Sequence, residues 1–378
     1  MRRAAALRFA LIACAGLLLA ACAPPEPTRQ ESYVFGTRIE IRLAGPETPT
    51  GRAAVAEVLR EFERLHRTYH AWQPSDLSTL NAALAAGKAH EVSAELAALI
   101  VSARELAASG EFLFDPGIGR LIGLWGFQSD EIAPRLPAEP DLAALLTQRP
   151  SIADIAVAKG ACAEPRNGEP VSASSGTTAA GGGCVTSRNK SVALDFGGYL
   201  KGVALDRAAA ILKAHGVQHA LVNIGGNILA LGNREARPEG KAWRVGIQHP
   251  RPAAVGNVPL ASLELRDGEA IGTSGDYHRF FTHDGRRYCH LIDPRDGRPH
   301  TGTQSLTILI PPGTNAGTRS DALSKPLFIS GERWLALASK LGIDAVLKVG
   351  ADGTALATPA MKARITIEAP DTPLKEAR

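Results

Sequence analysis

The C-terminal half of the chain is a series of short strand-like segments separated by turns, and this pattern restricts the fold more than any other feature. Asp284-Gly285, between two of these segments, is a typical two-residue hairpin turn, which joins antiparallel strands. Helical segments recur at 201–214 and 321–328. Because helices are mixed with mainly antiparallel strands, we expect an α+β fold with mainly antiparallel or mixed sheets and packed helices, rather than a doubly wound parallel sheet. The strand-like segments are 243–248, 261–265, 279–282, 286–292 and 305–310.

The N-terminal half is expected to contribute both a strand and helices. Residues 33–43 alternate like a single strand around Gly36. Residues 52–69 carry apolar side chains at helical spacing. Ser93 is a suitable N-cap for a further helix, which Gly110 ends.

The first 22 residues have the parts of a secretory signal peptide: a basic start, an apolar run at 4–21 and small residues at its end. The run stops at Leu19-Ala20-Ala21-Cys22, which resembles a bacterial lipobox, in which Cys22 becomes the lipidated first residue. An ordinary signal peptide that ends near a cysteine is the alternative. This is the one long apolar run in the sequence, so a polytopic membrane protein is excluded.

Residues 23–31 begin with a proline-rich stretch that cannot continue a helix, and we expect them to form a tether. The folded domain is then expected over 32–370, with an insertion at about 160–190. With a lipid on Cys22, the protein would be anchored on the periplasmic side of a bacterial membrane. Ala23, in place of an Asp, favours the outer over the inner membrane.

Composition and charge exclude two further classes of protein. With 45% hydrophobic and 21% charged residues the chain is typical of globular proteins, which excludes disorder as its main state. Arg2, Arg3 and Arg8 lie in the leader, so they account for three of the 42 basic residues and leave 39 against 38 acidic ones. No cationic field for nucleic acid remains.

Cys162 and Cys184 flank a stretch rich in Gly, Ser, Thr, Ala and Pro. Outside the cytoplasm such a pair can form a disulfide, worth about 3 kcal/mol for a loop of this size in the chain-entropy model. Two free thiols are the alternative. A metal site of the CxxC type is excluded because the sequence contains no such spacing.

Several Gly- and Asp-rich loops lie directly beside buried-looking segments. Glycines at a junction between a strand and a helix expose backbone N–H groups, which suit an anion such as pyrophosphate. Lys201 would add a positive charge there, and Asp321 is a hard oxygen ligand suited to Mg²⁺. The loops are 110–116, 195–202, 223–227, 273–277, 290–297 and 320–325.

Four common signatures of nucleotide-binding or hydrolytic sites are missing from the sequence. There is no GxGxxG and no GxxxxGK[ST], so neither Rossmann nor P-loop nucleotide binding is supported. There is also no Gly-x-Ser-x-Gly elbow and no cluster of His and Cys that would indicate a hydrolase.

Taken in order, the loops closely resemble the ApbE-type flavin transferases, also called FAD:protein FMN transferases. The likeness runs from about residue 33 to 350 and is broken by the insertion, and it implies an ApbE-type, T-fold-like architecture. The matching stretches are Phe35-Gly36-Thr37, 75–81, Leu113-Phe114-Asp115-Pro116, 124–127, 195–202, Thr273-Ser274-Gly275-Asp276-Tyr277 and His290-Leu291-Ile292-Asp293-Pro294.

The resemblance implies an enzyme that binds FAD and, with Mg²⁺, transfers the FMN half onto a Thr or Ser hydroxyl of a partner protein, releasing AMP. For this chain the partner would be an extracytoplasmic redox protein. Mg²⁺ would be held by the backbone oxygen of Gly198, the carboxylate of Asp321 and the residue at 325, and would neutralise charge on the diphosphate. Asp321 and His290 would be the catalytic residues, with His290 handling the acceptor's proton. FAD would contact Phe35, Trp72, Leu113, Phe114, Asp115, Asp195, Lys201 and Ile292.

The chain departs from the family pattern at its metal motif, where Lys325 replaces a Thr. A protonated Lys cannot ligate Mg²⁺, and it is expected to pair with Asp321 instead. Three interpretations are open: Lys325 replaces the cation, Ser324 supplies the lost hydroxyl, or the chain binds FAD without transferring it, as a flavin storage or delivery lipoprotein. The first predicts that FAD binding depends little on Mg²⁺.

Several other residues are expected to be structural. Trp125 and Phe127 are predicted to pack in the core rather than stack on a flavin, and Cys289 to be a buried thiol. For Asp206 a structural and a functional role are both open. His66, His70 and His90 are expected to be solvated on helices or loops.

Overall fold

The computed structural model describes residues 28–162, 182–237, 239–369 and 372–377. The predicted signal peptide, Cys22 and residues 23–27 of the predicted tether lie outside the described residues, as does most of the predicted insertion. Within the described part of the chain, no helix is both long and apolar enough to cross a membrane.

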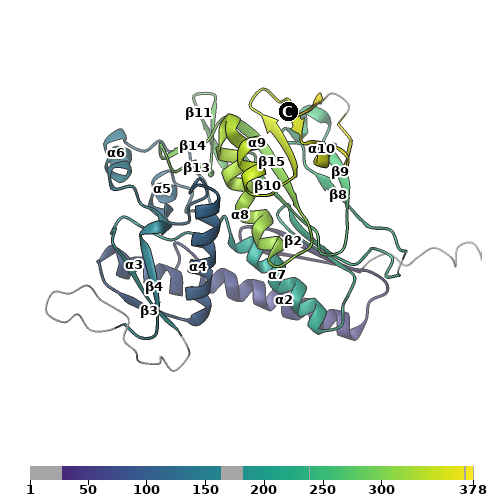
Figure 1. Cartoon of the computed structure of the whole chain (residues 1–378), viewed down its shortest axis with the longest axis horizontal. Coiled ribbons are helices and arrows are strands. Elements are labelled where there is room, and N and C mark those ends of the chain that lie inside the picture. The colour runs from purple at the N-terminus through teal and green to yellow at the C-terminus, as the bar shows by residue number, and fades with distance from the viewer. Residues whose placement is uncertain (1–27, 163–181, 238, 370–371, 378) are drawn as a thin grey trace, which may run out of the picture.

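A nine-stranded sheet forms the centre of the molecule (Figure 1). All of its neighbouring strands are antiparallel except the last pair, which is parallel. Helices pack on this mixed sheet, so the α+β prediction is confirmed. The strand order is β1 (Thr28–Val34), β2 (Thr37–Leu43), β6 (Ala220–Ile224), β7 (Asn227–Leu231), β10 (Ala270–Gly275), β15 (Thr303–Ile310), β16 (Ala345–Gly350), β17 (Ala355–Ala357) and β19 (Leu374–Glu376).

Both faces of the central sheet are buried, because successive side chains of a strand point to opposite faces. In β6, Ala220 and Val222 join the core beneath the helices, whereas Leu221 joins a second core on the other face. Among the helices that contribute to the first core are α7 (Leu200–Ala214) and α8 (Ala316–Ile329). The second core is closed by a small antiparallel sheet of β8 (Trp243–Ile247), β9 (Ala261–Leu265) and β18 (Ile365–Ile367).

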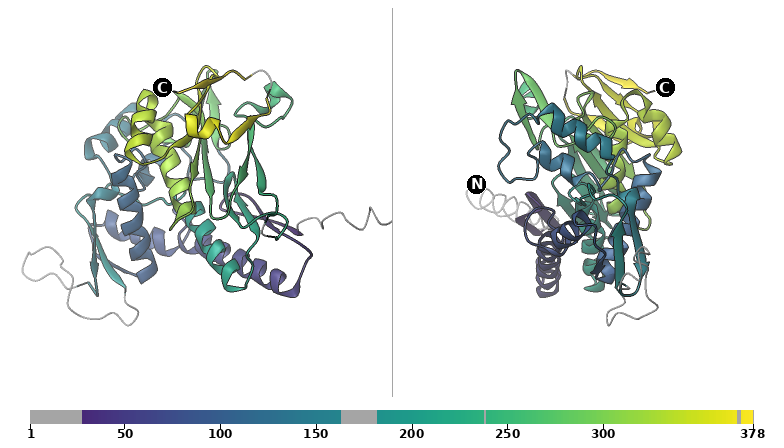
Figure 2. Two further views of the ribbon diagram at one scale, coloured as in Figure 1. Left: turned by 45° about the vertical axis from the view of Figure 1, so that its right-hand side comes forward. Right: turned by 90° about the vertical axis from the view of Figure 1, so that its left-hand side faces the viewer.

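A second group of elements lies on the far side of α7 and α8 from the large sheet (Figures 1 and 2). It contains α3 (Asp76–Ala85), α4 (Ala94–Ser109) and a three-stranded sheet, while α2 (Pro49–Thr68) runs along the lower edge in Figure 1. Ser93 caps α4, which ends at Gly110, as the sequence predicts. The small sheet has the order β3 (His90–Val92), β5 (Gly183–Ser187) and β4 (Ile155–Lys159).

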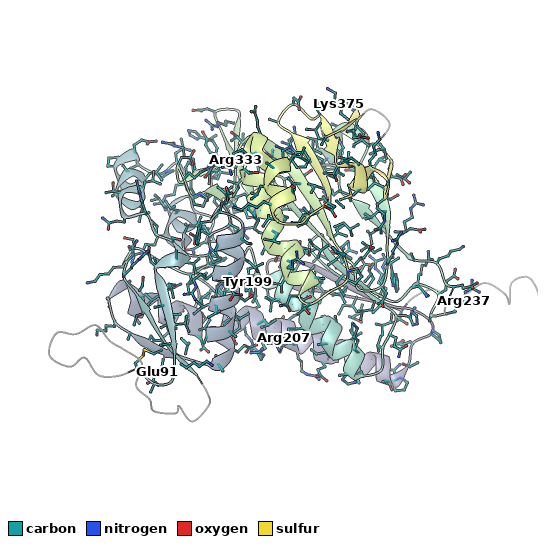
Figure 3. All side chains as sticks on the ribbon, viewed as in Figure 1. Glu91, Tyr199, Arg207, Arg237, Arg333 and Lys375 are labelled. Carbon is teal, nitrogen blue, oxygen red and sulfur yellow. A yellow bond between two sulfur atoms is a disulfide. The ribbon has the colours of Figure 1, made fainter. Side chains whose placement is uncertain are left out.

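Cys162 and Cys184 form a disulfide at the end of this small sheet, with their sulfur atoms 2.06 Å apart. Figure 3 shows its yellow sulfur atoms beside Glu91. The Cys162 amide donates a hydrogen bond to Glu91 Oε1 over 3.0 Å, which ties the segment that follows β4 to β3.

The remaining elements are short, and two of them contribute lining residues to the site described below. They are α5 (Gly119–Leu124), α6 (Glu139–Gln148), α9 (Trp334–Lys340), α10 (Pro359–Lys362), β11 (Phe280–His283), β12 (Arg286–Cys289), β13 (Ile292–Asp293) and β14 (Arg298–Pro299), with single 3-10 turns at Ile152–Asp154, Pro252–Val255 and Gly331–Arg333.

The structure corrects several sequence predictions. Residues 33–43 form a hairpin rather than one strand, because Phe35 and Gly36 turn the chain with φ of 57° and 66°. Residues 28–31, expected in the tether, belong to β1, and β19 extends the fold beyond the predicted boundary at 370.

Glycines let α7 and α8 approach each other closely. A Cβ on Gly202 would lie 2.5 Å from the carbonyl oxygen of Gly317, and one on Gly317 would lie 2.8 Å from the carbonyl oxygen of Gly202. The close approach brings Asp321 on α8 to the first turn of α7, where the Gly202 amide donates a hydrogen bond to Oδ2 over 2.9 Å. Asp206 adds a cap, since its carboxylate accepts from the amides of Gly317 and Thr318 at 2.8 Å each. Asp206 is therefore structural.

Candidate functional site

Two adjoining cavities, of about 170 and 450 Å³, open between the second group of elements and α7. They share lining residues, so together they form one region, which we call the central cleft; the smaller cavity is its inner part. The shared residues are Phe35, Trp72, Asp195, Gly197, Lys201 and Arg279.

The inner part of the central cleft brings together residues that are far apart in the sequence. Every residue predicted to contact FAD lines it, and His290, Gly198 and Lys325 line it as well. Asp321 is fully buried behind Lys325 and is not part of the lining. The predicted FAD-contact residues found there are Phe35, Trp72, Leu113, Phe114, Asp115, Asp195, Lys201 and Ile292.

Four rings form an aromatic wall along the outer part of the cleft: Phe35, His66, His70 and Trp72. Successive ring centroids are 5.6, 5.0 and 4.4 Å apart. His70 is 7% exposed, so the prediction that it is solvated is wrong. Its Nδ1 accepts a hydrogen bond from the Gln73 amide over 3.1 Å, and burial together with His66 lowers its pKa. A neutral, packed His70 suits a wall for a flat aromatic ligand.

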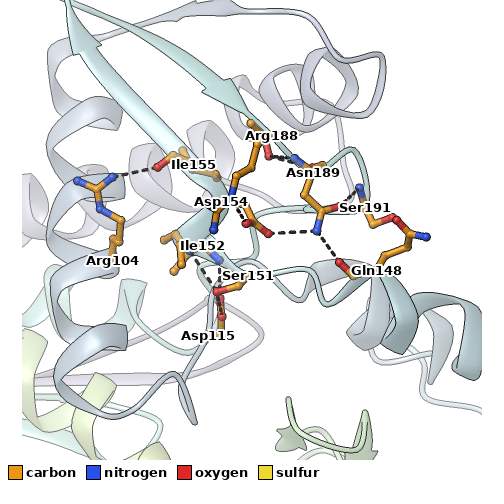
Figure 4. Close-up of polar contacts among 12 residues, drawn as sticks. Arg104, Asp115, Gln148, Ser151, Ile152, Asp154, Ile155, Arg188, Asn189 and Ser191 are labelled. Carbon is orange, nitrogen blue, oxygen red and sulfur yellow. Dashed lines mark hydrogen bonds and ion pairs between the residues drawn. The ribbon is translucent and has the colours of Figure 1, made fainter.

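The Asp115 carboxylate is occupied by the protein itself, as Figure 4 shows. Its Oδ1 accepts from the amides of Gly117 and Ile152 at 2.7 and 2.8 Å, and its Oδ2 accepts from the Ser151 hydroxyl at 2.5 Å. Burial raises the pKa of Asp115, and these hydrogen bonds oppose that shift. Asp115 therefore shapes the cleft by fixing its loop to the turn before β4.

Asp195 is held in a similar way at the mouth of the inner part. Its Oδ1 accepts from the Gly197 amide and its Oδ2 from the Gln128 side chain, both at 2.9 Å. The preceding residue, Leu194, exchanges two hydrogen bonds with the amide of Asn81, at 2.9 and 2.7 Å. The motif at 75–81 thus acts structurally, by fixing the segment that carries Asp195.

Three cations line the inner part of the cleft: Lys201, Arg279 and Lys325. Lys201 lies in the first turn of α7, with Nζ 3.5 Å from the Gly197 carbonyl oxygen. Arg279 donates from Nη2 to the carbonyl oxygens of Phe127 and Ser129, at 2.6 and 3.0 Å. Arg279 was not predicted as a site residue, because no local motif marks a lone arginine at the start of a hairpin.

His290 lies among these cations and is neutral. Its Nδ1 is 3.2 Å from the carbonyl oxygen of Arg279. A carbonyl oxygen only accepts, so Nδ1 carries the proton and the lone pair is on Nε2. Burial, followed by the positive charges of Lys201 and Arg279, lowers the pKa of His290 to about 3. Among the described residues only Nδ1 has a hydrogen-bond partner, so Nε2 is left for a group in the cleft.

The positions predicted to hold Mg²⁺ do not form a magnesium site in this arrangement. Lys325 Nζ lies 2.7 Å from Asp321 Oδ1, and Asp321 Oδ2 accepts from the Gly202 amide. Mg²⁺ needs about six oxygen ligands at short range, and both oxygens of this carboxylate already have a partner in the protein. In the described part of the chain, no group of three or more His, Cys, Asp or Glu residues could hold a metal ion.

Ser324 does not replace the missing hydroxyl ligand. Its Oγ is fully buried, 2.8 Å from Ser274 Oγ, and it donates to the Asp321 carbonyl oxygen over 2.8 Å. Burial lowers the pKa of Lys325, the carboxylate of Asp321 opposes this shift, and Lys201 adds to it. The carboxylate at 2.7 Å favours the charged ammonium.

Trp125 and Cys289 are buried in the structure, as the sequence predicts. Trp125 is 2% exposed, and its Nε1 donates to the Gly297 carbonyl oxygen over 2.7 Å. Cys289 is a buried thiol whose pKa is raised by burial to about 12. Phe127 is equally buried, although it also lines the cleft.

An α+β fold whose cleft combines an aromatic wall with three cations has the lining that suits a large aromatic anion, such as a dinucleotide. The chain belongs to the ApbE family, whose model matches residues 35–347. A FAD:protein FMN transferase of Rhodobacter capsulatus is 38% identical over 369 residues, which cover 96% of this chain and 64% of that relative. A FAD:protein FMN transferase of Treponema pallidum is 31% identical over 353 residues, or 90% of each chain.

Solved structures agree with this assignment. The ApbE protein of Thermotoga maritima superposes with a TM-score of 0.74 at 25% identity, covering 90% of this chain and 99% of that one. The apo form of the flavinyl transferase ApbE of Pseudomonas stutzeri superposes with a TM-score of 0.69 at 26% identity, covering 90% of this chain and 96% of that one. The chain spans slightly less than two thirds of its Rhodobacter relative, but nearly all of these two structures.

Proposed function

We propose that the protein is a FAD:protein FMN transferase, which moves the FMN half of FAD onto a Thr or Ser hydroxyl of a partner protein and releases AMP. The observation that carries the proposal is the neutral His290, whose Nε2 faces a cleft lined by three cations. The names of the relatives support the same reaction.

The lining of the cleft matches the parts of FAD. The rings of Phe35 and Trp72 and the apolar side chains of Leu113 and Ile292 suit the flat ring systems. Lys201 and the other two cations suit the diphosphate, because charge-assisted hydrogen bonds to phosphate oxygens are among the strongest available to a side chain. FAD is thus the ligand that uses both kinds of lining.

In the proposed reaction, a bond forms between the acceptor oxygen and the phosphorus of the FMN half. The bond between that phosphorus and the bridging oxygen breaks, and AMP leaves with the bridging oxygen. The hydroxyl proton passes to Nε2 of His290. A bound diphosphate would offset the positive field of Lys201 and Arg279, so it would raise the pKa of His290 and make it a better base.

Mg²⁺ has no step in this proposal, since its predicted ligands are engaged with Lys325 and Gly202. The residues of the chain itself bind and orient the substrate, and Lys201, Arg279 and Lys325 offset negative charge near the diphosphate.

A flavin storage or delivery protein is the alternative, and AMP release separates the two. The purified protein is incubated with FAD and a pool of Thr- and Ser-containing peptides, and AMP is quantified by chromatography. A transferase releases AMP in proportion to the peptide that is labelled. A storage protein binds FAD and releases none.

We also propose that the protein acts outside the cytoplasm, anchored by a lipid on Cys22 on the periplasmic side of a membrane, with the outer membrane favoured. The disulfide between Cys162 and Cys184 supports an oxidising compartment. The acceptor would then be a redox protein that faces the same compartment.

A further inference from the structure

We propose that the ammonium of Lys325 takes the place of a divalent metal ion in this cleft, so that the protein binds the diphosphate of FAD without Mg²⁺. The inference rests on the proposed function, because it takes FAD as the ligand. It concerns the site at the α7–α8 crossing, where the predicted metal ligands are found.

The ammonium of Lys325 is held in place and still has capacity for a ligand. Among the residues that the structure describes, it donates to two oxygens, both of Asp321: Oδ1 and the backbone oxygen, each at 2.7 Å. An ammonium has three protons, so one remains. Lys325 is 8% exposed and lines the inner part of the cleft, so the remaining proton is available to an anion bound there.

The backbone around Lys325 makes room for this side chain. A Cβ on Gly198 would lie 2.7 Å from Lys325 Cε and 3.0 Å from Cδ, so only glycine leaves space for the aliphatic stem at this position. The stem lies against Gly198 and its ammonium contacts Asp321, and these are the two other residues predicted to hold the metal. The ammonium thus occupies the region that a metal ion between those residues would need.

The charge of Asp321 is compensated within the protein. Besides Lys325, its carboxylate accepts from the Gly202 amide at 2.9 Å, in the first turn of α7, and lies 3.4 Å from the side-chain nitrogen of Asn227. The positive end of α7 therefore shares in neutralising Asp321. This leaves more of the positive charge of Lys325 for an anion in the cleft.

A divalent ion would be poorly bound beside this pair. It would lie within a few ångströms of the ammonium, and the repulsion would oppose its binding. Removing the ammonium would free Asp321 Oδ1, and a Thr at 325 would add an oxygen ligand. The arrangement therefore predicts that a single substitution converts the site from metal-independent to metal-dependent.

The test is calorimetric titration of the full-length protein with FAD, ADP and riboflavin, each with EDTA and again with Mg²⁺. For the wild type we expect FAD dissociation constants that agree within about twofold in the two buffers. Lys325→Met should raise the dissociation constants of FAD and ADP by about 10- to 100-fold in EDTA. The dissociation constant of riboflavin should stay unchanged, since riboflavin has no phosphate. Lys325→Thr should show the same loss in EDTA and regain affinity with Mg²⁺.

Lys348→Met is the matched control. Lys348 is another buried lysine, with Nζ 2.9 Å from the Gly331 carbonyl oxygen, and it does not line the cleft that the structure describes. This variant should bind FAD like the wild type. If either Lys325 variant fails to fold, the comparison of wild-type protein in EDTA and Mg²⁺ still decides the question.

Two results would overturn the inference: wild-type affinity for FAD at least tenfold weaker in EDTA than in Mg²⁺, or Lys325→Met binding FAD as tightly as wild type in EDTA. Either result leaves the proposed function in place. If the wild type binds FAD in neither buffer, the proposed function itself is wrong.

Discussion

Lys325 Nζ lies 2.7 Å from Asp321 Oδ1, one turn earlier on the same buried helix. Both side chains are nearly inaccessible, with 8% and 0% exposure, so the pair is shielded from solvent screening. A buried ion pair of this kind is costly to break by removing one partner. The pair lies beside a cleft lined by two further cations, Lys201 and Arg279, and this position suits the proposed role in holding an anionic ligand.

Replacing His290 should separate catalysis from binding. His290→Gln keeps a polar side chain in the cleft but removes the base, so we expect transfer to fall by about 10²- to 10⁴-fold. The dissociation constant of FAD should change by less than about threefold, since neutral His290 adds no charge. Stopped assays of AMP release and calorimetry measure the two quantities. An equal loss in the rate of transfer and in the affinity for FAD would show that His290 is a binding residue only.

The same residue should affect stability as pH falls. The pKa of His290 is about 3 in the folded protein, below the ordinary value of 6.5. Between these values the unfolded chain binds a proton that the folded protein does not, so His290 lowers the free energy of unfolding as pH decreases. The contribution is at most about 1.4 kcal/mol per pH unit. In urea unfolding at pH 7, 6 and 5, the free energy of unfolding should decline less with falling pH for His290→Gln than for the wild type. Equal declines in the two proteins would contradict a neutral, buried imidazole at His290.

Close packing of α7 and α8 should be sensitive to a single methyl group. On Gly202 a Cβ would lie 2.5 Å from one backbone atom of α8 and 2.7 Å from another, so Gly202→Ala must push the helices apart. We expect a loss of about 1–3 kcal/mol in the free energy of unfolding. Gly313→Ala is the control, because nothing lies within 4 Å of its Cβ position. Equal stability of the two variants would refute this account of the crossing.

The proposed anchor can be tested by fractionation. If Cys22 carries the lipid, Cys22→Ser should release the protein from the membrane fraction into the soluble fraction. Immunoblots of membrane and soluble fractions from cells that express each form measure the change, and separation of inner and outer membranes tests the sorting that Ala23 favours. Unchanged fractionation of the variant would count against lipidation.

Most helices could be predicted from the sequence because their signals are local. Ser93 and Gly110 mark the two ends of α4, and the apolar periodicity of 201–214 gives α7 within one residue. The hairpin of β1 and β2 could not be predicted from the sequence, because it turns at Phe35. This bulky residue has a positive φ, which such residues rarely adopt.

The central strand β10 was also missed, for a different physical reason. Its residues are small because α8 lies directly on it: a Cβ on Gly272 would be 2.0 Å from the Ser320 carbonyl oxygen. Small side chains at 272–275 favour a loop when only local preference is considered. Here tertiary packing requires them within a strand.

The residues of the site also fall into those that the sequence predicted and those that it did not. Ordered motifs predicted the residues that line the inner part of the cleft, and the pairing of Lys325 with Asp321 follows from their spacing on one helix. His66, His70 and Arg279 were not predicted as lining residues. A spacing of four between His66 and His70, just before Trp72, was the one available signal, because it is the spacing that puts two rings on one helix face. In the structure α2 ends at Thr68, and His70 follows it.

Mass spectrometry of an acceptor peptide tests the central claim, FMN transfer, most directly. The full-length protein is incubated in EDTA with FAD and a pool of peptides that vary around a single Thr, and with a matched pool in which Ala replaces that Thr. The account predicts that Thr peptides gain the mass of FMN less water, with AMP released in equal amount, and that the Ala pool and the His290→Gln enzyme give no product. FAD that binds the protein but leaves every Thr peptide unlabelled, with no AMP released in EDTA or in Mg²⁺, would contradict it.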